Sequence, residues 1–267
     1  MVGRASSLLG ALGLRGLAFV AIATGLGVYY TWSLSFWRAS EWWDVAFLAL
    51  ALIPAVMALV WFVLPAWRMR GTFLVGLAFA GAALALDRAD SKELANFSKL
   101  GAMTFLAFWF LAFFESSSWV ALVAAVIPWV DAWSVWRGPT RDILANREEL
   151  FSALSISFPS PGEHRAANLG LPDLLFFALF LSATVRFGLR TGLSWLVMTA
   201  SFGATMALAL AFSTDGLPAL PLLSAAFFLA NGDLIWRRAR EGVPAPAPGP
   251  APPQVTEPPP READAKS

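Results

Sequence analysis

The sequence predicts an all-α protein, a polytopic membrane bundle of eight transmembrane helices, or nine. Of its 267 residues, 58% are hydrophobic and 14% are charged, whereas a soluble domain carries about 25% charged residues. Apolar runs of about 20 residues recur along the chain, and each is long enough to cross a bilayer core of roughly 30 Å. The runs are continuously apolar rather than alternating, so a transmembrane β-barrel is not expected.

Composition also excludes several kinds of chemistry. The chain has no cysteine, which rules out disulfides and thiolate chemistry, and His164 is its one histidine, which leaves little scope for a zinc site. Without a His-Glu-x-x-His motif or a histidine in an apolar run, neither a metalloprotease nor a serine–histidine pair within the membrane is expected. The formal net charge of +1 gives no reason to expect a nucleic-acid partner.

Hydropathy and charge divide the chain into three regions. Residues 1–115 carry four spans, the first preceded by Arg4 and Arg15 and interpreted as a retained signal anchor. Residues 116–240 carry four more around a polar loop at 138–168, and residues 241–267 form a proline-rich tail predicted to be disordered. The predicted spans are 16–36, 43–65, 71–87, 100–115, 117–137, 169–187, 192–213 and 217–236.

The distribution of lysine and arginine favours both termini in the cytoplasm. With the N-terminus inside, nine of these residues fall on the inner side and eight on the outer side. The inner ones lie in short connections, which are the ones that set orientation. The loop 138–168 is then expected to face away from the cytoplasm.

Three polar or irregular features are predicted to meet at that outer side. Asp131 lies six residues before the end of one span, and Asp173 lies close to the start of the next, which is antiparallel to it. At about 1.5 Å of rise per residue, both carboxylates lie roughly 7–9 Å below the same surface. The stretch Pro218-Ala219-Leu220-Pro221 opens the last span from that side, and its prolines predict irregular backbone there.

Two carboxylates facing each other in a low dielectric share one proton, which is the arrangement that an aspartyl protease uses. Each Asp also has a simpler interpretation: a carboxylate near a span end can reach the interface, as Asp233 would beside Arg237, and Asn168 can serve as a helix N-cap. Two further functions therefore stay open, a catalytically silent scaffold or chaperone of the same fold and a proton-coupled transporter using Asp131 and Asp173.

The order of these motifs resembles the presenilin and signal peptide peptidase family, the GxGD-type intramembrane aspartyl proteases with nine helices. The resemblance covers about residues 117–236. It implies that Asp131 and Asp173 are the catalytic aspartates, and that Gly170 is the first glycine of the motif. Pro218, Ala219 and Leu220 match the tripeptide that supports the active site. The implied substrates are single-pass transmembrane proteins or peptides, cut within the lipid bilayer without a metal or organic cofactor.

The chain also departs from the family pattern. The usual Tyr-Asp is Val130-Asp131, Pro172 replaces the second glycine of the motif, and four spans rather than five precede the first aspartate. A proline is permitted in a first helical turn. Together with sixteen arginines against three lysines, these departures indicate a divergent prokaryotic relative, located in the cell membrane.

One stretch of the loop predicts a strand. Leu154-Ser155-Ile156-Ser157-Phe158 alternates apolar and polar residues until Pro159 ends it. An edge strand centred on Ile156 would pair with an unwound substrate close to the aspartates, as presenilin-like enzymes are thought to do. The alternative is an apolar patch resting on the membrane interface.

Overall fold

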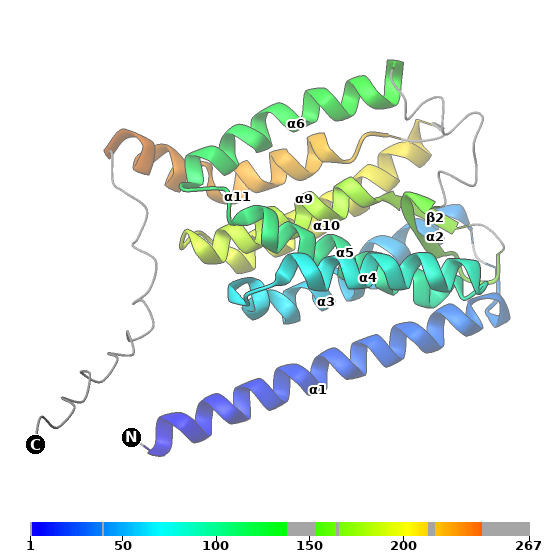
Figure 1. Cartoon of the computed structure of the whole chain (residues 1–267). Coiled ribbons are helices and arrows are strands. Elements are labelled where there is room, and N and C mark those ends of the chain that lie inside the picture. The colour runs from blue at the N-terminus through cyan, green and yellow to red at the C-terminus, as the bar shows by residue number, and fades with distance from the viewer. Residues whose placement is uncertain (1, 39, 138–152, 164–165, 213–216, 242–267) are drawn as a thin grey trace, which may run out of the picture.

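A computed structural model describes residues 2–38, 40–137, 153–163, 166–212 and 217–241 of the chain. In these ranges the protein consists almost entirely of helices, joined by short turns and one small β-hairpin (Figure 1). Residues 138–152 and 164–165 of the predicted loop, and residues 242–267 of the predicted tail, lie outside the described residues. The α-helices are α1 (Val2–Trp32), α2 (Glu41–Phe47), α3 (Ile53–Val63), α4 (Thr72–Arg88), α5 (Lys92–Leu111), α6 (Ser117–Arg137), α9 (Leu171–Arg186), α10 (Thr191–Ala211) and α11 (Leu220–Glu241).

Five described helical segments are long and apolar enough to cross a membrane, judged by length and composition alone. The other predicted spans, in α4, α9 and α11, are helical but are not among these five. Helix α9 has 16 residues and is therefore about 24 Å long, less than the roughly 30 Å of a bilayer core. The helical bundle is thus confirmed, and the number of spans stays a prediction. The five segments are Gly13–Ser35, Glu41–Arg68, Lys92–Leu111, Ser117–Ser134 and Thr191–Ala211.

Helices α2 and α3 are joined into one long segment by a π-helical stretch, η2 (Leu48–Leu52). The amide of Ile53 donates to the carbonyl of Leu48, one residue further back than in an α-helix. Pro54 follows at once and has no N–H to continue the α-helical pattern, so the backbone widens before it. Helix α10 packs against this stretch, where a Cβ added to Gly203 would lie 2.6 Å from Cβ of Ala49. Only glycine permits so close an approach.

Helix α9, which begins two residues before Asp173, is the central element of the bundle. It contacts α5, α6, α10 and α11, and Figure 1 shows it surrounded by them. Its apolar run is continuous because the helix is covered on most sides, as is expected for a helix that is hydrophobic all round. Its fully buried apolar side chains are Phe177, Ala178, Leu179, Phe180, Leu181 and Ala183.

The β-hairpin precedes α9 directly. Strand β1 (Ser155–Pro159) pairs antiparallel with β2 (Ala166–Gly170), with Ser155 opposite Gly170 and Ser157 opposite Asn168. The strand predicted at 154–158 is therefore confirmed. The span predicted to start at 169 begins instead at Leu171, because the residues before it are paired with β1 as a second strand.

The turn of the hairpin rests on the backbone that follows α1. The amide of Gly162 donates to the carbonyl of Ser33 at 2.8 Å, and Nε of Arg38 donates to the carbonyl of Gly162 at 3.2 Å. Gly162 has a φ of +68°, and a Cβ there would overlap the carbonyl oxygen of Phe36. Both the left-handed conformation and the close approach require glycine at this position. The hairpin is therefore fixed to the bundle at its tip as well as at α9.

Candidate active site

Asp131 lies near the end of α6 and accepts a hydrogen bond from another helix. Its Oδ2 lies 3.1 Å from the backbone nitrogen of Leu220, the first residue of α11. The first amides of a helix have no partner within it, and the N-terminus carries partial positive charge. Because α6 runs alongside α11 (Figure 1), the carboxylate of one helix caps the other. The side chain is partly exposed.

Asp173 occupies the first turn of its own helix, α9. Its Oδ2 accepts a hydrogen bond from the backbone nitrogen of Gly170 at 3.2 Å, so Gly170 is the N-cap residue. Pro172 stands at the start of the helix, where a missing N–H costs nothing. Asn168, the other candidate for the cap, lies instead in β2 and accepts a hydrogen bond from Oγ of Ser157 at 2.7 Å.

The two carboxyl groups are neighbours in the fold. They lie near enough to interact electrostatically, as their predicted positions on antiparallel helices require. In each of the two aspartates, Oδ2 accepts a hydrogen bond from a backbone amide. Both acids therefore stand at helix N-termini, where a negative charge is favoured. Backbone amides therefore hold one oxygen of each acid.

The Pro218-Ala219-Leu220-Pro221 stretch is the third predicted feature of the site, after Asp131 and Asp173. Leu217 to Ala219 are not helical, and α11 starts at Leu220. Pro218 thus precedes the helix, while Pro221 fits into its first turn. Ala219 and Leu220 are 5% and 2% exposed, so their buried side chains fix the first residues of α11 in the core. The amide of Leu220 is thereby directed at Asp131.

Comparison with protein-family models found no match for this chain, and comparison with curated proteins found none either. The resemblance to the presenilin and signal peptide peptidase family therefore stays a prediction carried by the motifs themselves. What the structure adds is geometry. It brings together Asp131, Asp173 and Leu220, which sequence reasoning had placed at one end of the bundle.

The hairpin has two different edges. Ile156 is 2% exposed and lies opposite Leu169 in β2, so it packs in the core and does not line an open edge. The carbonyls of Ser155, Ser157 and Pro159 point away from β2 and accept hydrogen bonds from side chains of α1 and α5. The outer edge of β1 is thus occupied, whereas β2 has its outer edge at exposed Ala166 and Asn168.

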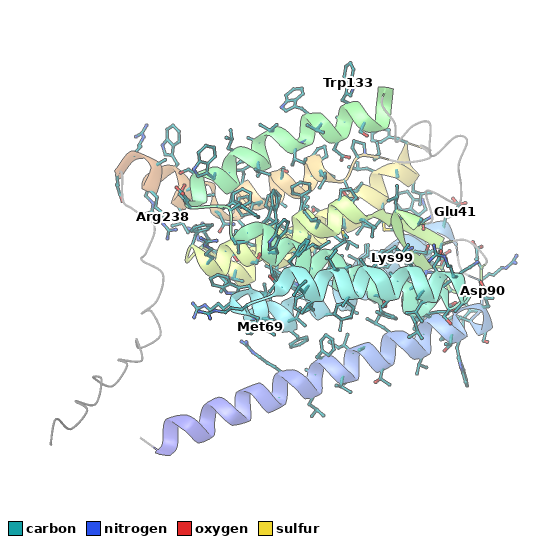
Figure 2. All side chains as sticks on the ribbon, in the orientation of Figure 1. Glu41, Met69, Asp90, Lys99, Trp133 and Arg238 are labelled. Carbon is teal, nitrogen blue, oxygen red and sulfur yellow. The ribbon has the colours of Figure 1, made fainter. Side chains whose placement is uncertain are left out.

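Sequence reasoning missed the residues that occupy the β1 edge. The predicted span 100–115 starts after Lys99, but Lys99 lies inside α5, is 8% exposed, and donates to the carbonyl of Ser155 at 3.1 Å. A charged residue next to an apolar run was the available signal. Figure 2 shows Lys99 within the bundle near the hairpin, whereas Trp133, at the end of α6, points away from the bundle. The other donors are Tyr29, Tyr30 and Asn96.

The sequence predicted only one of the two arginines that contact Asp233. Its carboxylate lies 3.6 Å from Arg237, as predicted, but Arg190 binds it through two nitrogens at 2.7 and 2.8 Å. This hydrogen bond raises the pKa of the Arg190 guanidinium above its ordinary value. Asp233 therefore joins α11 to the start of α10, away from the aspartate pair. Among the described residues, no group of three or more His, Cys, Asp or Glu is placed to hold a metal ion.

Proposed function

We propose that this protein is an intramembrane aspartyl protease, a multi-pass protein of a prokaryotic cell membrane that hydrolyses peptide bonds within transmembrane segments. The observation that carries the proposal is the meeting of two carboxyl groups, each bound to a backbone amide, at the starts of α9 and α11. Three distant motifs supply this arrangement. They resemble motifs of the presenilin and signal peptide peptidase family, with Val130 in place of the usual tyrosine and Pro172 in place of the second glycine.

The chemistry follows from two acids that share one proton. The ionised carboxyl accepts a proton from water, which attacks the carbonyl carbon of the substrate. The protonated carboxyl donates to the carbonyl oxygen, and a proton then passes to the leaving amine. The amides of Leu220 and Gly170 fix one oxygen of each acid, so that the pair is oriented before a substrate arrives.

A substrate helix must be unwound before it can be cut, because its peptide bonds are shielded. Unwinding frees backbone groups that cost several kcal/mol each in hydrocarbon unless they find partners. The outer edge of β2 supplies such partners at Ala166 and Asn168, and β2 runs directly into the helix of Asp173. We therefore assign the substrate-pairing edge to β2 rather than to β1.

The test is turnover by the purified protein of a labelled single-pass substrate. Asp131→Asn and Asp173→Asn each remove one member of the pair, and we expect each to lower the rate by at least about 100-fold, the contribution typical of an acid or base catalyst. Asp90→Asn is the matched control. Asp90 is exposed, with an 88% exposed side chain, and has a φ of 56°, a conformation that Asn also accepts.

Other results of the same experiment would contradict the proposal. If neither the wild type nor Asp90→Asn cuts the substrate, the protein is a catalytically silent member of the same fold. If Asp131→Asn and Asp173→Asn both cut it as fast as Asp90→Asn, the two acids serve only as helix caps and the cleavage does not use them. Circular dichroism and gel filtration of the three variants show whether a lost rate reflects chemistry or unfolding. Proton-coupled uptake into vesicles, lost in the same Asn variants, would instead identify a transporter.

A further inference from the structure

The outer edge of β1 is closed by four side chains that come from two different helices. The hydroxyls of Tyr29 and Tyr30, at the end of α1, donate to the carbonyls of Pro159 and Ser157 at 2.6 and 2.9 Å. From α5, Nδ2 of Asn96 donates to the carbonyl of Ser157 at 3.5 Å, and Nζ of Lys99 donates to that of Ser155 at 3.1 Å. Every second carbonyl of β1 is thus bound, which fixes the strand along its whole length.

Lys99 stands at the end of this edge that is nearest the aspartates. Its acceptor, Ser155, is fully buried and lies directly opposite Gly170 in the hairpin. The amide of Gly170 in turn donates to Asp173. The Ser155 carbonyl and the Gly170 amide both face away from the partner strand, and next to them the amide of Leu171 donates to the carbonyl of Leu154 at 2.9 Å. The acceptor of the buried ammonium group therefore lies on the strand that pairs with the backbone holding Asp173.

We propose that Lys99 is a positioning residue, which sets where β2 and Asp173 lie relative to each other and so selects the substrate bond that is cut. The inference rests on the proposed proteolytic function. Residues of an antiparallel strand alternate between its two edges, so a one-residue slip of β1 would turn its bound carbonyls towards the other side. The donor at Ser155 opposes that slip at the end of the strand that leads to α9.

Stability alone does not account for a lysine here. An ammonium group removed from water carries a desolvation cost, and replacing such a group by an apolar residue of similar volume is often neutral or stabilising. The group is retained in a core where Leu100, Ala102 and Phe108 of the same helix are buried. A geometric task, fixing the backbone of β1, explains its presence.

The experiment compares Lys99→Met with Lys92→Met. Methionine keeps most of the length of lysine and removes the donor, while Lys92 opens the same helix with a 76% exposed side chain. The first measurement is hydrogen exchange of the strand-pairing amides of β1 and β2 in the detergent-solubilised full chain. The second is mass spectrometry of the cleavage products of a labelled single-pass substrate, together with kcat and KM.

We expect exchange of the hairpin amides to rise about tenfold in Lys99→Met, which corresponds to loss of one hydrogen bond to a charged group. Cleavage should spread to neighbouring peptide bonds, and kcat should fall with little change in KM. Lys92→Met should match the wild type in all of these. Unchanged exchange, or cleavage at the wild-type bond alone with wild-type kcat, would overturn the proposal.

The experiment distinguishes failure of the proteolytic function from failure of the role of Lys99. A wild-type protein that cuts nothing refutes the proteolytic function, whereas a wild-type protein that cuts and a Lys99→Met variant that cuts identically refute only the role of Lys99. If Lys99→Met does not fold, Tyr30→Phe removes a single hydroxyl from the same edge. That variant is then held to the same criteria of exchange and cleavage position.

Discussion

The backbone amide of Leu220 donates a hydrogen bond to Oδ2 of Asp131 at 3.1 Å, although 89 residues separate the two in the chain. The bond makes the start of α11 part of the proposed catalytic centre. It also explains why a proline-flanked stretch occurs there, because Pro218 keeps the preceding backbone out of the helix and leaves the amide of Leu220 without a partner in its own helix.

The first prediction is that this amide matters more than the side chain that follows it. Leu220→Pro removes the N–H at a position where proline suits the start of a helix. Losing a hydrogen bond to a charged group costs about 1.5–3 kcal/mol, so we expect turnover to fall by roughly 10- to 100-fold. Leu220→Ala loses the buried side chain but keeps the donor. It should be less stable to heat and yet retain most of the rate per folded molecule. Equal losses of rate in the two variants would contradict the prediction.

The second prediction concerns pH. The mechanism needs one ionised and one protonated carboxyl at the same time, so protonating both or ionising both stops it. The rate of substrate cleavage should therefore give a bell-shaped profile, measured in detergent across acid and alkaline buffers. Control samples returned to the starting pH should recover their rate, which excludes irreversible unfolding. A rate that is flat across this range would rule out the aspartate pair as acid and base.

The third prediction concerns orientation. Figure 2 shows Glu41 and Asp90 at the end of the bundle that carries the hairpin, and Met69 and Arg238 towards the opposite end. Arginines concentrate at that opposite end, so we expect it to face the cytoplasm. They are Arg68 and Arg70 beside Met69, Arg186 and Arg190 around the connection from α9 to α10, and Arg237, Arg238 and Arg240 in the last turns of α11.

Single cysteines test this orientation cleanly, because the chain has none of its own. Lys92→Cys and Met69→Cys place a thiol at opposite ends, where the native side chains are 76% and 56% exposed. An impermeant thiol reagent added to intact cells should label only Lys92→Cys, and permeabilised cells should show labelling of both. Labelling of Met69→Cys alone in intact cells would reverse the orientation.

Sequence reasoning predicted the parts of this site that depend on local pattern and chain direction. Helices follow from continuous apolar runs, and antiparallel neighbours bring Asp131 and Asp173 to one end without further information. The strand at Ser155–Pro159 also follows from its own alternation. The strand at Ala166–Gly170 could not be predicted in this way, because its sequence Ala-Ala-Asn-Leu-Gly does not alternate and the strand forms by pairing with β1.

The sequence also could not predict the hydrogen-bond partners of polar groups that lie far apart in the chain. The carbonyls of β1 bind side chains 56 to 130 residues away, and no periodicity records such a separation. Lys99 directly precedes the predicted span 100–115, and its bond to the carbonyl of Ser155 depends on where α5 packs. The pairing of Arg190 with Asp233 could not be predicted either, because it follows from the packing of α10 on α11.

The last prediction addresses the strand edge on which we propose that a substrate pairs. Along β1, the carbonyls of Ser155, Ser157 and Pro159 face outwards, so in the antiparallel register the outward-facing positions of β2 are Ala166, Asn168 and Gly170. The amide of Gly170 is already bound by Asp173. Asn168 is exposed and lies at the centre of the strand, so it is the best place to block pairing.

Asn168→Pro removes the outward N–H of β2 without touching an amide that pairs with β1, and proline is tolerated on the free edge of a sheet. We expect KM for a single-pass substrate to rise and the rate at low substrate to fall by about tenfold, the effect of one lost hydrogen bond and a disturbed edge. Asn168→Ala is the matched control, since it loses the bond to Ser157 but keeps the backbone donor. Ile156→Pro, which breaks the inner pairing with Leu169, should abolish cleavage by opening the hairpin itself. Wild-type kinetics in a folded Asn168→Pro protein would show that the substrate does not pair with β2.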